Sequence, residues 1–207
     1  MTDLPTPPPP RRHDAARTRA DLERAALELF TTLGYRATTT ALVAERARTA
    51  EGTIYRHFGG KVELFIAVHR GAQRWGAALV KATAEDEGRP VPCRERLQRI
   101  GRRLLQAADS EPALVRMVLG QWSEPSHGER DRNAAREFRE ALQQVVASGK
   151  SDGVIRAGPA ELWGAVWLEV AGSAVEKVAS KEWPADHPSI ALVLEAAWDA
   201  IAPRSGP

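Results

Sequence analysis

Residues 38–61 read TTTALVAERARTAEGTIYRHFGGK, and this stretch decides the fold of the chain. The three threonines at its start can cap a first short helix with their hydroxyl groups. A second helix is predicted from about Glu51 to Phe58, with Ile54 and Phe58 one turn apart. These two side chains therefore share a face, and we expect that face to point into a core. The pattern predicts two short helices joined by a tight turn.

The opposite face of the second helix has a different character. At about 100° per residue, Arg56 lies nearly opposite the Ile54 and Phe58 edge. Gly52 stands beside Arg56 and would let the backbone approach a ligand closely, while Thr53 and Tyr55 flank the pair as hydrogen-bond donors. An arginine fork fits the edge of guanine. This division into a buried and a polar face is what a helix-turn-helix needs in a DNA major groove.

The same residues carry a family resemblance. The run Gly52–Phe58 followed by Lys61 resembles, position by position, the recognition helix of TetR-family bacterial transcriptional repressors. Upstream, Gly34–Thr39 resembles the family's entry into the first motif helix, and the likeness extends over roughly Asp14–Leu64. From its position opposite the buried edge we predict that Arg56 reads a base, the alternative being that it clamps the DNA backbone. Thr40 and Tyr55 are predicted to contact phosphates, and the resemblance implies the same for Lys61. The candidate DNA-contacting residues are Thr39, Thr40, Gly52, Thr53, Tyr55, Arg56, His57 and Lys61.

The turn between the two helices departs from the family pattern. A glycine and an apolar residue usually stand where this chain has Arg48 and Thr49. Arg48 is therefore expected to take the left-handed conformation that glycine adopts freely. Ala50 replaces the usual serine and supplies no cap. Each departure is expected to cost on the order of 1 kcal/mol.

Composition and charge fit a DNA-binding protein with a reduced thiol. The 207 residues are 43% hydrophobic and 27% charged, with a single cysteine, Cys93. Twelve Lys or Arg against seven Asp or Glu between Arg11 and Trp75 give that third of the chain an excess charge of +5, although the whole chain carries only +2. We expect a cytoplasmic protein, because no signal peptide and no membrane span can be recognised.

The sequence offers no pattern for catalysis or metal binding. Its five histidines are scattered, and no two stand at positions i and i+4 of one helix. Cys93 follows Pro92 at the start of a predicted helix, where an incidental or structural thiol is the favoured reading. No glycine-rich phosphate loop follows a strand. We therefore expect no enzyme activity, no cofactor and no metal.

An all-α fold of about nine helices is predicted, with an N-terminal helix-turn-helix head and a helical-bundle body. Residues 1–13 form a flexible arm with four consecutive prolines, whose Arg11 and Arg12 are either solvated, the favoured reading, or reach DNA. Residues 14–75 form the head and the start of a linking helix, and residues 76–207 form the body. No strand pattern is convincing. The expected helices span residues 14–33, two short segments within 38–58, 61–84, 93–108, 111–119, 133–148, 159–180 and 188–202, with loops at 123–132 and 149–158.

The first helix should turn a stripe of apolar side chains toward the core, namely Leu22, Ala26, Leu29, Phe30 and Leu33. The last two helices are apolar on more than one face, so they must be covered on several sides. A chain of this length can achieve that by dimerising, and the family resemblance implies a four-helix dimer interface made by these helices. The candidate interface residues are Val166, Val170, Ala174, Ile190, Val193, Leu194 and Ala197.

Large side chains in the body could line a cavity, although ordinary core packing is the better reading for any one of them. The resemblance implies a site for a small hydrophobic effector, with Trp75, Met117, Trp122, Trp163 and Trp167 as candidate lining residues. The leading hypothesis is a homodimeric transcriptional repressor that an effector releases from operator DNA. The alternatives are a DNA-binding regulator without ligand control, and a helical interaction module that has lost DNA binding.

Overall fold

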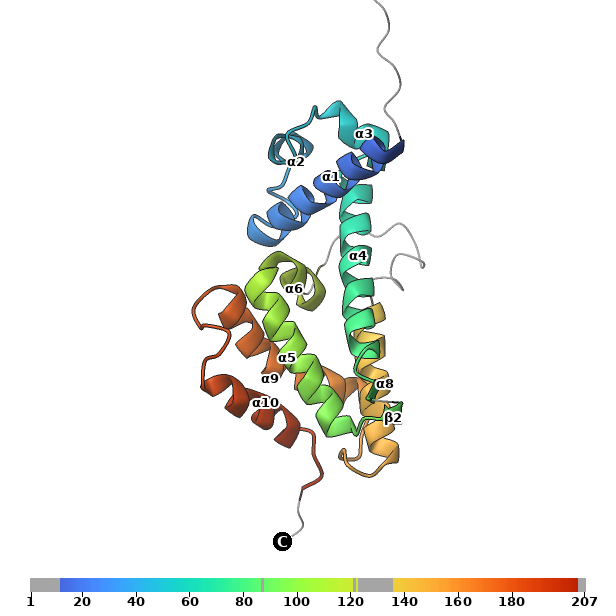
Figure 1. Ribbon diagram of the computed structural model, residues 1–207, viewed down its shortest axis with the longest axis vertical. Coiled ribbons are helices and arrows are strands. Elements are labelled where there is room, and N and C mark those ends of the chain that lie inside the picture. Colours follow the sequence, from blue (N-terminus) through green and yellow to red (C-terminus); the bar gives the residue numbers. More distant parts are fainter. Residues whose placement is uncertain (1–11, 87, 121, 123–135, 205–207) are drawn as a thin grey trace, which may run out of the picture. The chain divides into compact units, whose positions relative to one another are not determined.

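The computed structural model describes residues 12–86, 88–120, 122 and 136–204 (Figure 1). This part contains nine helices and one short β-ribbon, which confirms the all-α fold. The expected loop at 123–132 and most of the N-terminal arm lie outside the described residues. The helices are α1 (Arg12–Thr32), α2 (Thr40–Arg46), α3 (Gly52–Phe58), α4 (Lys61–Lys81), α5 (Cys93–Ser110), α6 (Pro112–Leu119), α8 (Glu137–Ser151), α9 (Ala160–Ala179) and α10 (Ser189–Asp199).

The chain divides into two compact units between Val68 and His69, within α4. The sequence interpretation placed the end of the head at Trp75, in the same helix. None of the helices described is long and apolar enough to cross a membrane.

The first unit contains α1, α2, α3 and the first turns of α4. Its core is formed by side chains that are almost completely buried, among them Leu22, Phe30, Ile54 and Leu64. The ring of Phe30 lies 5.2 Å from that of Phe65, edge to face. As expected from its apolar stripe, α1 provides the wall against which α2 packs.

One position of that stripe was predicted wrongly. Leu33 was expected to point inward, but 52% of it is exposed. The helix ends at Thr32, and Gly34 then turns the chain with a φ of +83°. The Leu33 N–H still donates to the Leu29 carbonyl at 2.9 Å, but the turn at Gly34 ends the helix directly after it, so no further helical turn packs beside the Leu33 side chain.

The second unit is a bundle arranged around α9, which packs against α5, α6, α8 and α10. Trp167 of α9 is 1% exposed, and Ile100, Leu104 and Phe138 are completely buried. The helices α4 and α8 come close where a β-carbon added at Gly76 would lie 2.9 Å from the Phe138 ring. A larger residue at position 76 would force Phe138 to move.

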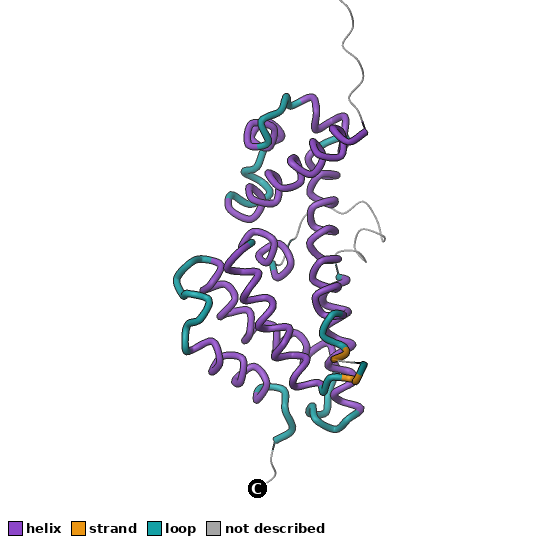
Figure 2. The backbone as a smooth tube through the Cα atoms, in the orientation of Figure 1, coloured by secondary structure: helices purple, strands orange, loops and turns teal. Residues whose placement is uncertain are grey.

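Two features of this unit correct the sequence interpretation. No strand was expected, but Glu85–Asp86 (β1) pairs antiparallel with Arg89–Pro90 (β2), shown in orange in Figure 2. Gly88 permits the tight connection with its φ of +76°. Arg99 of α5 bonds to the Asp86 carboxylate at 2.6 Å and ties the ribbon to the bundle.

The second correction concerns Gly149, which was read as the start of a loop. It lies inside α8, which continues to Ser151. A β-carbon added at Gly149 would come within 2.5 Å of the Cys93 sulfur. The glycine therefore permits close packing of α8 on α5, and the turn itself falls at Gly153, whose φ is +72°.

Candidate nucleic-acid interface and body cavities

The first motif helix begins as the sequence suggests. Thr39 occupies the N-cap position of α2, and its hydroxyl oxygen accepts a hydrogen bond from the Leu42 backbone N–H at 3.2 Å. This bond satisfies one of the N–H groups that have no partner within the helix. Val43 and Ala44 are buried on the inner side of α2. Thr39 therefore fixes where the helix starts, and this structural role does not depend on a contact between its hydroxyl and DNA.

The turn between α2 and α3 has the expected unusual backbone. Arg48 adopts a φ of +54°, the left-handed conformation that a glycine would take without strain. The Thr49 N–H donates to the Ala44 carbonyl at 2.9 Å and closes the turn. No side chain caps the start of α3, in agreement with the absence of a capping residue at Ala50. The turn keeps a compact geometry at the cost of one strained residue.

The outer face of α3 presents the expected set of groups. Gly52, Tyr55 and Arg56 are exposed, while Ile54 and Phe58 are buried on the opposite side. A β-carbon at Gly52 would meet no atom of the chain within 4 Å, so internal packing does not require a glycine there. Within the described residues Arg56 has no hydrogen-bond or ion-pair partner. Its guanidinium is therefore available to a ligand outside the chain.

Thr53, His57 and Lys61 are only partly exposed. The Thr49 hydroxyl donates to the Thr53 hydroxyl oxygen at 3.1 Å. The Lys61 ammonium lies 4.2 Å from the centre of the Tyr35 ring and donates to the Arg36 carbonyl at 3.4 Å. Lys61 is thus oriented by the chain that precedes α2, at the start of α4.

Two residues that the sequence interpretation omitted also belong to this surface. Arg19 of α1 lies 4.1 Å from the centre of the Phe58 ring and donates to the His57 carbonyl at 2.9 Å, so it ties α1 to the end of α3. The Thr40 hydroxyl donates to the Glu51 carboxylate at 2.5 Å. Glu51 was overlooked because it lies just outside the periodic positions of α3, but its place directly before Gly52 could have drawn attention to it.

The four tryptophans and the methionine proposed for an effector site lie in different surroundings. Met117 and Trp167 are completely or almost completely buried in the core. The indole N–H of Trp122 donates to the Met117 carbonyl, and that of Trp163 donates to the Ala157 carbonyl, both at 3.1 Å. These bonds fix two of the indoles to neighbouring backbone.

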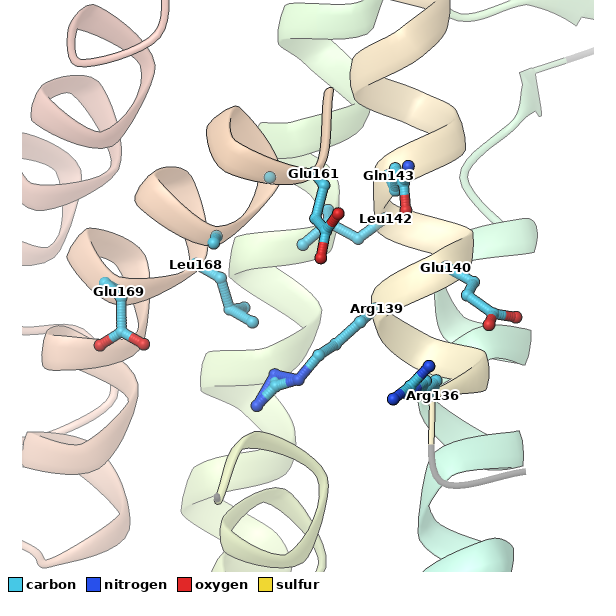
Figure 3. A pocket seen from close by; sticks show the side chains of 10 residues that line it. Arg136, Arg139, Glu140, Leu142, Gln143, Glu161, Leu168 and Glu169 are labelled. Carbon is cyan, nitrogen blue, oxygen red and sulfur yellow. The ribbon is translucent and has the colours of Figure 1, made fainter. Parts of the chain in front are cut away.

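Trp75 lines an open groove of about 420 Å³ between α4 and α5, with Arg103 and Gln106 on the other side. A separate cavity of about 560 Å³ lies between α8 and α9. In Figure 3, Arg139 reaches from α8 into this space and Leu168 of α9 points toward it. None of the five aromatic and methionine candidates lines the larger cavity. Its walls are instead charged at Arg136, Arg139, Glu140, Glu161 and Glu169.

The residues proposed for dimerisation fall into two groups. Ala174, Leu194 and Ala197 are buried within the chain itself, and Leu194 packs closely on Gly101 of α5. Val166, Val170, Ile190 and Val193 are partly exposed. Two leucines outside the proposed set are more open, because Leu162 is 48% and Leu192 is 71% exposed. The helices α9 and α10 thus retain apolar surface that their own chain leaves uncovered.

Two titratable groups of the described body residues have shifted pKa values. Burial raises the pKa of the Cys93 thiol to about 11, which keeps it protonated near neutral pH. Burial, with a smaller contribution from the Arg139 charge, lowers the pKa of His69. Among the described residues, no group of three His, Cys, Asp or Glu side chains could hold a metal ion.

Comparison with known proteins connects this interface to a family. Residues 23–68 match the family model described as bacterial regulatory proteins, tetR family. The chain is 36% identical over 87 residues to the HTH-type transcriptional regulator TtgR of Pseudomonas putida, and equally similar to the probable regulator ArpR of that species. These alignments cover 42% of this chain and 41% of each relative. The match is therefore confined to less than half of either protein.

The structural likeness extends further. A putative tetR family transcription regulator from Shewanella sp. PV-4 superposes with a TM-score of 0.72 over 90% of this chain and 99% of that chain, at 20% identity. A TetR family regulator from Marinobacter aquaeolei VT8 gives a TM-score of 0.73 over 94% and 100%, at 21% identity. A complex of SmeT with triclosan gives 0.61 over 92% and 99%, at 15% identity. At these identities the likeness shows the fold alone.

Proposed function

The chain belongs to the tetR family of bacterial regulatory proteins, and from this premise we propose that it is a sequence-specific DNA-binding transcriptional repressor. The observation that carries the proposal is the two-sided α3. Ile54 and Phe58 anchor the helix from behind, while Gly52, Tyr55 and Arg56 face outward. A recognition helix in a major groove needs this arrangement. The proposal assigns regulation, and not catalysis, to the chain.

Within this interface we assign different roles to the exposed and the partly exposed residues. Arg56 reads a base, since its guanidinium lies opposite the buried edge and has no partner in the described residues. Thr40, Tyr55 and Lys61 bind phosphates, and Thr39, Gly52, Thr53 and His57 complete the contact surface. The Lys61 ammonium already lies at the first turn of α4, whose free N–H groups favour an anion.

The test is a selection of binding sites from random duplex DNA, followed by affinity measurements at several salt concentrations. The wild-type protein is expected to enrich one motif, and log affinity should fall linearly with log salt. Arg56→Ala should relax the preference at one base pair of each half-site. The lost arginine–guanine contact discriminates against a wrong base by about 1–3 kcal/mol. Lys61→Ala should weaken binding to all sequences alike and flatten the salt slope by about one unit. A protein that enriches no motif would contradict the proposal.

We propose further that a small molecule bound in the body controls this DNA binding. SmeT, which shares the fold, is known as a complex with triclosan. The helix α4 belongs to both compact units, so a change in the body can reach the head along one continuous helix. The cavity between α8 and α9 is one candidate site. The other candidate lining residues are those proposed from the sequence, namely Trp75, Met117, Trp122, Trp163 and Trp167. A regulatory ligand must change DNA affinity, and DNA must change ligand affinity by the same factor.

The functional unit is proposed to be a homodimer formed through α9 and α10. Its contact surface includes the partly exposed Val166, Val170, Ile190 and Val193, extended by Leu162 and Leu192. A β-carbon at Gly172 would meet nothing within 4 Å, so α9 offers space for close approach of a second helix. Ala174, Leu194 and Ala197 support this surface from inside the chain. Two heads held in one dimer would bind two half-sites of an operator.

A further inference from the structure

Glu51 joins the beginnings of the two motif helices. It is exposed, it directly precedes Gly52 of α3, and its Oε1 atom accepts the hydroxyl hydrogen of Thr40 at 2.5 Å. Thr40 is the first residue of α2. The hydrogen bond therefore holds a carboxylate beside the surface that we assign to DNA, and it leaves the lone pairs of Oε2 without a partner in the described residues.

A carboxylate at this place is solvated in the free protein, and it becomes unfavourable beside DNA unless a hydrogen-bond donor faces it. The head carries an excess of positive charge that suits phosphate, and a negative side chain would repel phosphate. No ion pair within the described residues involves Glu51, whereas Glu23 and Glu28 of α1 are paired with Arg19 and Arg46. The charge of Glu51 is thus not neutralised by a neighbour, and its DNA partner must be a hydrogen-bond donor.

The base edges of the major groove supply few donors. Guanine presents two acceptors and thymine presents one acceptor and a methyl group, whereas cytosine presents the N4 amino group. Adenine presents a donor beside an acceptor, a pair that an amide satisfies better than a carboxylate. A carboxylate accepts from cytosine N4 and has no proton to offer the other edges.

We propose that Glu51 is a specificity-determining residue, which accepts a hydrogen bond from the N4 amino group of one cytosine in each half-site. Thr40 is then a positioning residue for this contact. Its single hydroxyl hydrogen is donated to Glu51, so this role replaces the phosphate contact proposed above for that hydroxyl. The inference rests on the proposed DNA-binding function. Glu51 would be a second base-contacting side chain besides Arg56. It carries the opposite charge and lies at the other end of α3.

The experiment selects binding sites from random duplex DNA with the wild type, Glu51→Gln and Thr40→Val. The wild type should prefer cytosine at one position by about fivefold or more. Glu51→Gln should change that preference to adenine and leave the rest of the motif unchanged, because an amide can pair with adenine N6 and N7. Thr40→Val should keep cytosine with a weaker preference, since the carboxylate is no longer held.

Asp21→Asn is the matched control, because it removes one partly exposed carboxylate from α1 of the same unit. This variant should select the wild-type motif. Suppose that Glu51→Gln also selects the wild-type motif and binds every sequence more tightly by a common factor. Glu51 then acts only by repelling phosphate, and the inference is overturned while the proposed function stands. If the wild type enriches no motif, the proposed function fails and the inference fails with it. Circular dichroism should show that all variants are folded.

Discussion

The side-chain amide of Gln73 in α4 donates to the backbone carbonyl of Val118 in α6 at 3.1 Å. The neighbouring carbonyls also receive donors from outside the helix, since Arg139 of α8 donates to Leu119 and Trp122 donates to Met117. The last carbonyls of a helix lack partners within it, so these three side chains satisfy groups that would otherwise be costly to bury. The end of α6 is thereby attached to the helix that continues into the head.

Replacing Gln73 by Met should lower the free energy of unfolding by about 1–2 kcal/mol. The variant keeps the side-chain length but removes the donor to Val118. Urea unfolding followed by tryptophan fluorescence would measure the change, with the exposed Gln144→Met in α8 as control. An unchanged stability would mean that losing the buried and unpartnered Gln73 Oε1 offsets the lost bond.

His69 should make the protein less stable in mild acid. Its pKa is lowered first by burial and then by the Arg139 charge, so the folded protein resists protonation while the unfolded chain takes up a proton near pH 6.5. Stability should therefore fall as the pH drops below about 6.5 and should not depend on this group above it. Unfolding at pH 7.5 and pH 5.5 would show a smaller difference for His69→Gln than for the wild type. An equal difference would place the acid sensitivity elsewhere.

Arg48→Gly should stabilise the first unit by about 1 kcal/mol, because the left-handed conformation at position 48 strains any residue with a β-carbon. Arg48→Ala removes the same charge and keeps the strain, so it separates the two effects. Thermal unfolding of both variants would be compared with that of the wild type. If alanine stabilises as much as glycine, charge repulsion and not the backbone is responsible.

Leu192→Glu should convert the proposed dimer to a monomer, since it would bury an unpaired charge in the interface. Sedimentation velocity at micromolar concentration would measure the association state. Leu33→Glu is the control, because Leu33 is an exposed leucine in the first unit. A wild-type protein that sediments as a monomer would contradict the dimer, as would a Leu192→Glu protein that remains dimeric.

Local sequence was sufficient to predict the helices and the two faces of α3. The spacing of Ile54, Arg56 and Phe58 fixes their directions once the segment is helical, because the turn of a helix is set by backbone geometry. The strained turn was predicted from the family resemblance, since Arg48 stands where that family usually has a glycine, and its φ is +54°. The assignments of individual DNA contacts remain predictions.

Tertiary structure decided which of several local possibilities each remaining residue adopts. Glycine is a residue type that favours a turn, yet Gly149 lies within α8, at a point where Cys93 leaves no space for a β-carbon. Trp122 and Trp163 suit a cavity by size, but each donates its indole N–H to a neighbouring carbonyl. Thr40 and Glu51 are eleven residues apart, and only the packing of α2 against α3 brings their side chains together. The sequence by itself determined the helices and their faces, because periodicity is local. Only the fold decided the pairings between them, because contacts distant in sequence depend on the shape of the space left by every other side chain.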